Sequence, residues 1–505
     1  MVPSESSRLP LRSPAWLLVP IVAVRAAGLA WGALDIDETD FLLMARMMLA
    51  GEIPYVGTVD KKPVLAYLFY APSALSGFHM WPMQLLAMGW VLATSLVVGR
   101  AALAWTGRRE AAWAGAWLAC LAQTACVPAV NTETMLALPA AAGLLFFVRS
   151  WQSGRARDDF LAGICVGLAT LFKHQAGIEL LAFLATSAVA AGRGVRGLAA
   201  RALALLAGFA LPWLLAAGVY AALGHLGEFV EWNVWRNLVL AAAGAGSPIP
   251  RLLEGLALGI LLAAPLAWAL ALRETRDLLG GPDRDPVRVG LALALWLTFV
   301  PVSLGGRFYG HYFLQFAPPL ALFATPGALR LLDRWPALSP GRRRLVATAL
   351  ALPLAVFLGV SWGGGFLGRF PLQEPRTREL ARWIATHTAP SERIAVWGHY
   401  SPIYVLAGRL SGTRYHNTSI QIGDFDPHHL PEGFDLSAHV SGRDVDRLLG
   451  DLEANRPAIF VDTAPADIHD WRHVPLEVVP RLKKYVDDRY VLVARPAGAA
   501  VYRRR

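Results

Sequence analysis

Ionisable side chains that could carry chemistry gather in short stretches between long apolar segments. The densest stretch holds Asp37, Glu38 and Asp60 and runs into Lys61 and Lys62. Asp37 and Glu38 could simply start a surface helix, which is the commoner use of such a pair. A further carboxylate, Glu133, falls where two apolar segments turn. An ionisable group at the end of a membrane span costs stability unless it is solvated, paired or used, so these residues are candidates for a functional site.

Cations and aromatic side chains occupy two later stretches of the same kind. Lys173 and His174 stand between two apolar segments, and Arg307, His311 and Tyr312 stand where another begins. The guanidinium group is suited to bidentate contact with phosphate, so the last stretch indicates anion binding. Each stretch alone also fits a cation at a span end beside an aromatic belt. A site follows only if the stretches meet on one face of the molecule.

The composition defines the elements that must position these residues. Of the 505 residues, 55% are hydrophobic and only 17% are charged, whereas about a quarter are charged in soluble chains. The hydrophobic residues concentrate in segments of about 20, the length that crosses a bilayer core. The net charge is +10, and most cationic residues of the apolar region lie in short clusters between these segments. Such clusters are typical of topology signals, so we do not expect nucleic acid as a partner. We expect a polytopic α-helical membrane protein with about eleven spans, over 15–34, 82–104, 111–129, 134–149, 159–172, 177–192, 199–221, 252–272, 288–304, 312–332 and 344–362.

Arginine divides the connecting loops into two sets that alternate along the chain. One set is rich in arginine, from Arg8 and Arg12 through Arg149, Arg155 and Arg157, and the other is poor in cations. The positive-inside rule predicts a multi-pass protein of the cytoplasmic (inner) membrane, with its N-terminus and arginine-rich loops in the cytoplasm. Every candidate residue named above then lies on the outward side. An odd number of spans places the chain after the last span outside the cytoplasm as well.

The chain divides into two domains. Residues 1–365 form the transmembrane domain, and its first outward loop, 35–80, contains an apolar helical pattern over 38–50. This helix is too short to cross the bilayer, so we expect it along the interface, with Asp37 as its cap and Gly51 at its end.

Residues 366–505 have the composition of a soluble domain. Helices over 378–386 and 444–455 alternate with strands over 393–397, 457–461 and 490–494, which indicates a small extracytoplasmic α/β domain. One cluster in this domain, Asp424, Asp426, His428 and His429, is more typical of a polar loop than of a metal site.

Several short motifs carry a resemblance to a known family. Asp37-Glu38 precedes an apolar helix ending in Met48-Leu49-Ala50-Gly51, and Pro54-Tyr55 and Asp60-Lys61-Lys62-Pro63 follow. This loop resembles the first outward loop of the GT-C membrane glycosyltransferases, in the branch of protein O-mannosyltransferases and lipid A aminoarabinose transferases. Weaker signatures of bacterial relatives are Lys173-His174-Gln175-Ala176 and the stretch RFYGHYFLQFAPP over 307–319. The similarity covers most of residues 15–330.

The resemblance implies a GT-C fold and a chemistry. Such enzymes take a sugar from a polyprenyl-phosphate carrier at the outer face of the membrane and pass it to an acceptor glycan, lipid or protein. The family pattern makes Asp37 the base that removes the acceptor proton, with Glu38 as the alternative. Lys62 then stabilises the phosphate leaving group, with Arg307 and Lys173 as further candidates.

The remaining candidates, Glu133, His174, His311, Tyr312 and Asp60, would complete the pocket for the sugar and the phosphate. A divalent metal occurs in some members of this branch, and carboxylate and imidazole groups could ligate one. No spacing here demands a metal, so we expect no obligatory cofactor.

Two positions depart from the family pattern. Lys61-Lys62-Pro63-Val64 stands where many relatives have Lys-Pro-Pro, so the lysine assignment could shift by one residue. Glu133 stands where relatives often have aspartate.

Two other functions fit part of this pattern. A ligase that uses a polyprenyl-diphosphate carrier would need the same cations. A lipid or solute transporter usually places charges near the bilayer midplane within repeated halves, and this sequence has neither feature. The residues do not identify the sugar or the acceptor.

Overall fold

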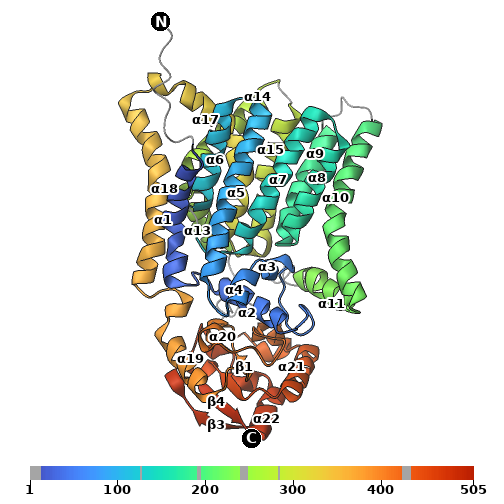
Figure 1. The fold of residues 1–505 in the computed structure, drawn as a ribbon, viewed down its shortest axis with the longest axis vertical. Coiled ribbons are helices and arrows are strands. Elements are labelled where there is room, and N and C mark those ends of the chain that lie inside the picture. Colours follow the sequence, from blue (N-terminus) through green and yellow to red (C-terminus); the bar gives the residue numbers. More distant parts are fainter. Residues whose placement is uncertain (1–12, 125–127, 190–194, 239–247, 283–284, 424–433) are drawn as a thin grey trace.

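The computed structural model has three layers along its long axis (Figure 1). It describes all residues except 1–12, 125–127, 190–194, 239–247, 283–284 and 424–433, so the predicted polar loop with Asp424, Asp426, His428 and His429 lies outside the described residues. A helix bundle forms one end, the α/β domain forms the other end, and short helices lie between them (Figure 1).

The bundle consists of long helices packed side by side (Figure 1). Its helices are α1 (Ala15–Trp31), α5 (Trp81–Thr106), α6 (Arg109–Thr124), α7 (Thr132–Ser153), α8 (Ala156–Thr170), α9 (Ile178–Val189), α10 (Val195–Ala222), α13 (Pro248–Leu256), α14 (Pro265–Gly280), α15 (Pro286–Leu297), α16 (Phe299–Ser303), α17 (Ala317–Asp333) and α18 (Pro340–Phe366).

Small residues let some of these helices approach closely. A Cβ atom added to Gly163 of α8 would lie 2.1 Å from the backbone oxygen of Leu205 in α10, and one added to Gly208 would lie 2.1 Å from the backbone oxygen of Phe160. Glycine at both positions therefore allows backbone contact between α8 and α10, a packing mode typical of helices in membranes.

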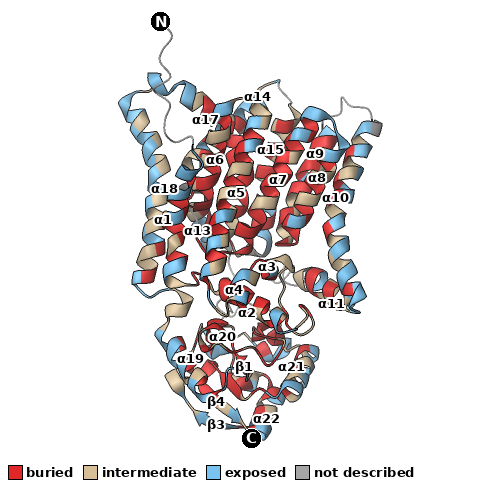
Figure 2. Cartoon of the chain, viewed as in Figure 1, coloured by how far each residue is buried: buried red, intermediate tan, exposed pale blue. Residues whose placement is uncertain are grey.

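The outer helices α10 and α18 are exposed along much of their length (Figure 2), and their exposed side chains include large apolar ones, as a surface facing lipid requires. Leu203 and Leu214 of α10 are 69% and 67% exposed, and Leu345 of α18 is 69% exposed. The inner helices α5 to α8 are buried along much of their length (Figure 2). A bundle that is apolar inside and outside is the pattern of a membrane domain.

The predicted number of spans is not confirmed. Within the described residues, five helices are long and apolar enough to cross a bilayer, and two bent helix pairs raise the number to seven at most. Helices α6, α8, α9 and α17 occupy predicted spans but contain 16, 15, 12 and 17 residues, fewer than the roughly 20 that cross a bilayer core. The predicted span 252–272 breaks by 96° between its two helices.

The middle layer contains the predicted interfacial helix, α2 (Ile36–Leu49), with α3 (Leu65–Leu68), α4 (Ala71–Leu75) and α11 (Leu226–Val230). The chain bends by 65° between α1 and α2. The prediction of Asp37 as the cap is wrong: Asp35 caps the helix, because its side chain accepts from the backbone N–H of Asp37 while Glu38 reaches back to the backbone of Asp35. This reciprocal arrangement is a capping box. Gly51 ends α2 with a φ of 95°, as predicted.

The C-terminal domain is built on a four-stranded sheet of order β1-β2-β4-β3, in which β1 and β2 are parallel and the other pairs antiparallel. Its elements are α19 (Pro375–His387), β1 (Ile394–Trp397), α20 (Pro402–Ala407), α21 (Gly442–Asn455), β2 (Ile459–Asp462), α22 (Pro480–Arg489), β3 (Tyr490–Ala494) and β4 (Ala500–Arg504). All five helices and strands predicted for this region are present, and β1 and β2 are buried along their whole length. The sequence pattern gave no indication of β4.

Candidate active site

The predicted residues come from five segments that reach the same end of the bundle. Asp37 lies in the first turn of α2, Lys62 in the loop that follows, and Glu133 in the first turn of α7. Lys173 precedes a short 3-10 helix over His174–Gly177, and His311 and Tyr312 lie in another over Gly310–Phe316.

Asp37 and Lys62 face each other across the first outward loop. Lys62 Nζ lies 4.0 Å from Asp37 Oδ2, and each side chain is 32% exposed. Burial raises the pKa of Asp37, and the Lys62 ammonium partly offsets this effect. A carboxylate with a raised pKa next to a cation, both still open to solvent or substrate, is a suitable pair for proton transfer beside an anion.

The backbone of Lys62 is held by two buried tyrosines. The hydroxyls of Tyr55 and Tyr67 each donate to the Lys62 carbonyl at 2.8 Å, and Tyr67 also contacts Asp60 Oδ2 at 3.3 Å. Burial lowers the pKa of Lys62, but the carboxylates of Asp37 and Asp60 outweigh it, so the pKa lies above its usual range. The side chain therefore stays cationic, as a ligand for phosphate must. Sequence reasoning did not single out either tyrosine, although Pro54-Tyr55 was part of the family signature.

Glu38 has different surroundings from its neighbour Asp37. It is fully buried, and its carboxylate accepts from the backbone N–H groups of Leu34, Asp35 and Val130 and from the side chain of Gln84. These four donors tie α1, α2, α5 and the start of α7 together. Burial raises the pKa of Glu38 to about 7, against the opposing effect of these hydrogen bonds. Its donors already occupy both oxygens, so the geometry favours Asp37 over Glu38 as the base.

A buried ion pair joins Glu133 to Lys173. Glu133 is fully buried and Lys173 is 8% exposed, and the two side chains are in direct contact. Lys173 Nζ also lies 3.9 Å from the centre of the Tyr312 ring. Three predicted residues from α7, the α8–α9 connection and the stretch 305–312, predicted as the last outward loop, therefore meet. Both Glu133 and Tyr312 are close enough to raise the pKa of Lys62.

A second contact links the last outward loop to the start of α2. His311 Nδ1 lies 3.9 Å from Asp35 Oδ2, and Asn131 donates to the same oxygen at 3.0 Å. Asp35 and Asn131 were not predicted as site residues, although each lies two residues before a predicted one, Asp37 and Glu133. In the part of the chain that the structure describes, no three His, Cys, Asp or Glu side chains form a group that could hold a metal ion.

Two predicted residues stand apart from these contacts. His174 stacks on Trp213 with ring centres 5.5 Å apart, and burial lowers its pKa to about 4, so its ring is neutral. Arg307 is half-buried, and no described residue forms a hydrogen bond or ion pair with its guanidinium group. The structure therefore does not join Arg307 to the Asp37–Lys62 pair, although it lies four residues before His311.

The C-terminal domain contacts α2 directly beside Asp37. Thr39 Oγ1 lies 2.6 Å from Ser401 Oγ, and Asp40 Oδ1 lies 3.7 Å from His416 Nε2. Burial raises the pKa of Asp40 and lowers the pKa of His416, so burial opposes charge on both partners. Contacts between residues more than 360 positions apart leave no local pattern, which is why sequence reasoning missed them.

Comparison with known proteins agrees with the fold. Residues 60–220 match the family model described as dolichyl-phosphate-mannose-protein mannosyltransferase. The chain is similar to the solved structure of ArnT from Cupriavidus metallidurans bound to undecaprenyl phosphate, with a TM-score of 0.58, 16% identity, and coverage of 97% of this chain and 98% of that chain. No curated protein sequence matches the chain.

Two structures from Archaeoglobus fulgidus share the fold with similar coverage. One is an oligosaccharyltransferase tethered to an acceptor peptide with an NVT sequon, at TM-score 0.55 and 13% identity, with 97% of this chain and 74% of that chain covered. The other is AglB in complex with an inhibitory peptide and a dolichol-phosphate, at TM-score 0.54 and 14% identity, with the same coverage. These findings confirm the predicted resemblance: the chain has the fold of the GT-C membrane glycosyltransferases.

Proposed function

We propose that this protein is a glycosyltransferase of the cytoplasmic membrane. It moves a sugar from a polyprenyl-phosphate carrier to an acceptor hydroxyl at the outer face. The Asp37–Lys62 pair carries this proposal, because it places a carboxylate that can act as a base 4.0 Å from a cation, and both side chains are partly exposed. The match to a mannosyltransferase family model over 60–220 supports the reaction class. The undecaprenyl phosphate bound to ArnT and the dolichol-phosphate bound to AglB support the class of donor.

Asp37 and Lys62 have different roles in one substitution reaction at the anomeric carbon. The acceptor oxygen forms a bond to the anomeric carbon of the sugar while the bond from that carbon to the phosphate oxygen breaks. Asp37 takes the proton of the acceptor hydroxyl, and the electron pair of the broken bond leaves on the phosphate. Lys62 lies opposite the growing negative charge, so it binds the transition state more strongly than the ground state.

Donor binding would strengthen the base. In the free protein the Lys62 ammonium lowers the pKa of Asp37. When the phosphate takes Lys62 as its partner, Asp37 loses part of that stabilisation and gains an anionic neighbour, and both changes raise its pKa further. A carboxylate with a pKa nearer to neutrality is a better proton acceptor at neutral pH.

The other predicted residues take supporting roles. Arg307 has no partner among the described residues and is the second cation for the phosphate. Lys173 is already paired with Glu133, so its charge is offset and it contributes less to phosphate binding. The Glu133–Lys173 pair instead fixes Tyr312 and orders the pocket wall. We assign Asp60 and His311 to the sugar side of the site, whereas His174, which stacks on Trp213, would act only through the surrounding wall. No metal takes part in this proposal.

A transfer assay tests the proposal. Membranes that contain the protein are incubated with a panel of polyprenyl-phosphate sugars, and the products are identified by mass spectrometry. We expect a glycosylated product with the wild-type chain and none with Asp37→Asn. Product formation only from polyprenyl-diphosphate donors would favour a ligase, and the absence of any covalent product would favour a transporter.

A matched pair of lysine variants tests the phosphate ligand. Lys62→Gln should raise KM for the donor and lower kcat, whereas Lys61→Gln should leave both nearly unchanged. The reverse result would shift the assignment by one residue, the alternative that the departure from Lys-Pro-Pro left open.

A further inference from the structure

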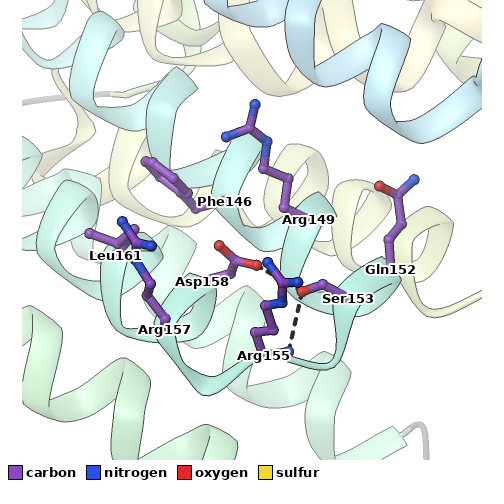
Figure 3. A pocket seen from close by; sticks show the side chains of 8 residues that line it. All are labelled: Phe146, Arg149, Gln152, Ser153, Arg155, Arg157, Asp158 and Leu161. Carbon is purple, nitrogen blue, oxygen red and sulfur yellow. Dashed lines mark hydrogen bonds between the residues drawn. The ribbon is translucent and has the colours of Figure 1, made fainter.

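A hollow of about 500 Å³ lies at the turn between α7 and α8 (Figure 3). Helix α7 begins beside the candidate active site with Glu133 and ends at Ser153, in the wall of the hollow. A helix of 22 residues is about 33 Å long, close to the thickness of a bilayer core. The hollow and the active site therefore lie at opposite ends of the bundle, and the arginine pattern predicts that this end is cytoplasmic.

Three arginines line the hollow, one from each part of the turn (Figure 3). Arg149 comes from the last turns of α7, Arg155 directly precedes α8, and Arg157 lies in the first turn of α8. No residue that the structure describes forms an ion pair with any of the three. Asp158, the one carboxylate of the lining, accepts from Ser153 Oγ at 2.7 Å, so the hollow carries excess positive charge.

A neighbouring arginine shows how this chain satisfies a structural cation. Arg201 is buried, contacts Asp159 at 3.0 Å and lies 4.1 Å from the centre of the Trp151 ring. It joins α10 to α8 with its charge neutralised. The three arginines of the hollow have no such partner and are exposed, so their charge is available to a ligand.

Apolar side chains complete the wall of the hollow. Phe146 and Leu161 are half-buried, and the guanidinium of Arg149 lies 5.8 Å from the centre of the Phe146 ring. We propose that this hollow binds the phosphate headgroup of an anionic phospholipid, with the arginines on the phosphate and its chains along Phe146 and Leu161. Basic pockets between transmembrane helices on the cytoplasmic side suit anionic headgroups, and guanidinium groups bind phosphate oxygens in pairs. A free phosphate ion could contact the arginines in the same way, but it has no chains to lie along Phe146 and Leu161.

Competition between lipids tests the proposal on the full-length protein. The protein is purified in detergent with equimolar phosphatidylglycerol and phosphatidylcholine of the same chain length, and bound lipids are counted by native mass spectrometry. The variant Arg149→Gln/Arg155→Gln/Arg157→Gln is compared with Arg334→Gln/Arg342→Gln/Arg344→Gln, which removes the same charge from exposed positions at the same end of the bundle.

We expect wild-type protein and the control triple to prefer phosphatidylglycerol, and the hollow triple to lose about tenfold or more of that preference. Equal loss in both triples, or no preference in the wild-type chain, would overturn the proposal. Inorganic phosphate that binds the wild-type protein without a preference between the two lipids would also overturn it, in favour of a soluble anion.

Loss of three arginines in one loop can change membrane insertion, so a second variant keeps the charge. Arg149→Lys/Arg155→Lys/Arg157→Lys retains the topogenic cations but loses the guanidinium forks. We expect its preference for phosphatidylglycerol to fall by a few fold, and an unchanged preference would contradict the proposed headgroup contacts. Transfer activity at the opposite end is a separate readout, so failure here leaves the proposed glycosyltransferase function untouched.

Discussion

Exchange of each neighbouring carboxylate for its amide separates catalysis from stability. Asp37→Asn keeps the shape of the side chain but removes the base, so the rate of transfer should fall by about 10²–10⁴-fold. Its effect on unfolding should be small. The contact with Lys62 is 4.0 Å long and both side chains are 32% exposed, and such a pair contributes about 1 kcal/mol or less.

Glu38→Gln should lower the stability of the protein and leave the rate of transfer nearly unchanged. The two carboxylate oxygens of Glu38 each accept two hydrogen bonds: Oε2 from Leu34 and Asp35, and Oε1 from Val130 and Gln84. A glutamine amide must turn its NH₂ group toward one of these pairs and leaves two donors without an acceptor. Rotation of the Gln84 amide can rescue one of them. One buried donor then stays without an acceptor, and at roughly 1–3 kcal/mol for such a group we expect a loss of about 1–3 kcal/mol.

Two measurements on the purified variants test whether Asp37 serves catalysis and Glu38 serves stability. Transfer is followed with a donor that the wild-type chain uses, and unfolding is followed by tryptophan fluorescence in detergent during heating. Asp37→Asn should be inactive with a nearly unchanged Tm, and Glu38→Gln should have a lower Tm with activity retained well below that temperature. Full activity in Asp37→Asn, or an inactive Glu38→Gln of unchanged Tm, would refute the division of roles.

Four further expectations follow from the same contacts. Activity needs ionised Asp37, so it should fall as the pH drops through the raised pKa of this group, and Lys62→Gln should move this acid limb to higher pH because Lys62 lowers that pKa. Glu133→Gln should destabilise the protein by about 3–5 kcal/mol by leaving Lys173 charged and buried, and Glu133→Gln/Lys173→Met should recover much of the lost Tm. Prolonged dialysis against EDTA should leave the initial rate of transfer unchanged, and a loss restored by added metal would contradict the expected metal independence. A reporter fused after Arg505 should be found outside the cytoplasm, and a cytoplasmic signal would contradict the predicted orientation.

Local patterns predicted the parts of the fold whose causes are local. The apolar spacing after Asp37 predicted α2, and Gly51 predicted its end, because a left-handed residue after a helix favours glycine. The cap was misplaced by two residues, since Asp35 and Asp37 are both suitable caps and only the reach of Glu38 back to Asp35 selects one. Strands β1, β2 and β3 followed from short apolar runs with clear boundaries.

There is also a physical reason why the predicted number of spans is not confirmed. Hydropathy measures transfer into lipid, and a helix buried against other helices has the same composition whether or not it crosses the bilayer. Helix α9 has 12 described residues, whereas the apolar sequence predicted a span over 177–192. Residues 190–194 lie outside the described part of the chain. The break between α13 and α14 also leaves no mark in hydropathy, although Pro265 stands at the start of α14.

The candidate site could be predicted as a set of residues but not as a set of contacts. Asp37, Lys62, Glu133 and Lys173 stood out because charges are costly beside apolar spans. Their pairing depends on how distant helices pack, so the sequence did not predict that Lys173 would take Glu133 rather than remain open for phosphate. The contacts of Asp40 and Thr39 with the C-terminal domain were hidden for the same reason.

The Asp37–Lys62 pair is longer than two buried Arg–Asp pairs of this chain. Arg236 contacts the buried Asp444 at 2.7 Å, and Arg201 contacts the buried Asp159 at 3.0 Å. These pairs are short because a buried charge is stable only with close partners. Asp37 and Lys62 stay 4.0 Å apart, and the carbonyl of Lys62, not its ammonium, is fixed by tyrosines. Unlike these two buried pairs, the Asp37–Lys62 pair is open, as it must be if a phosphate and a hydroxyl are to come between its partners.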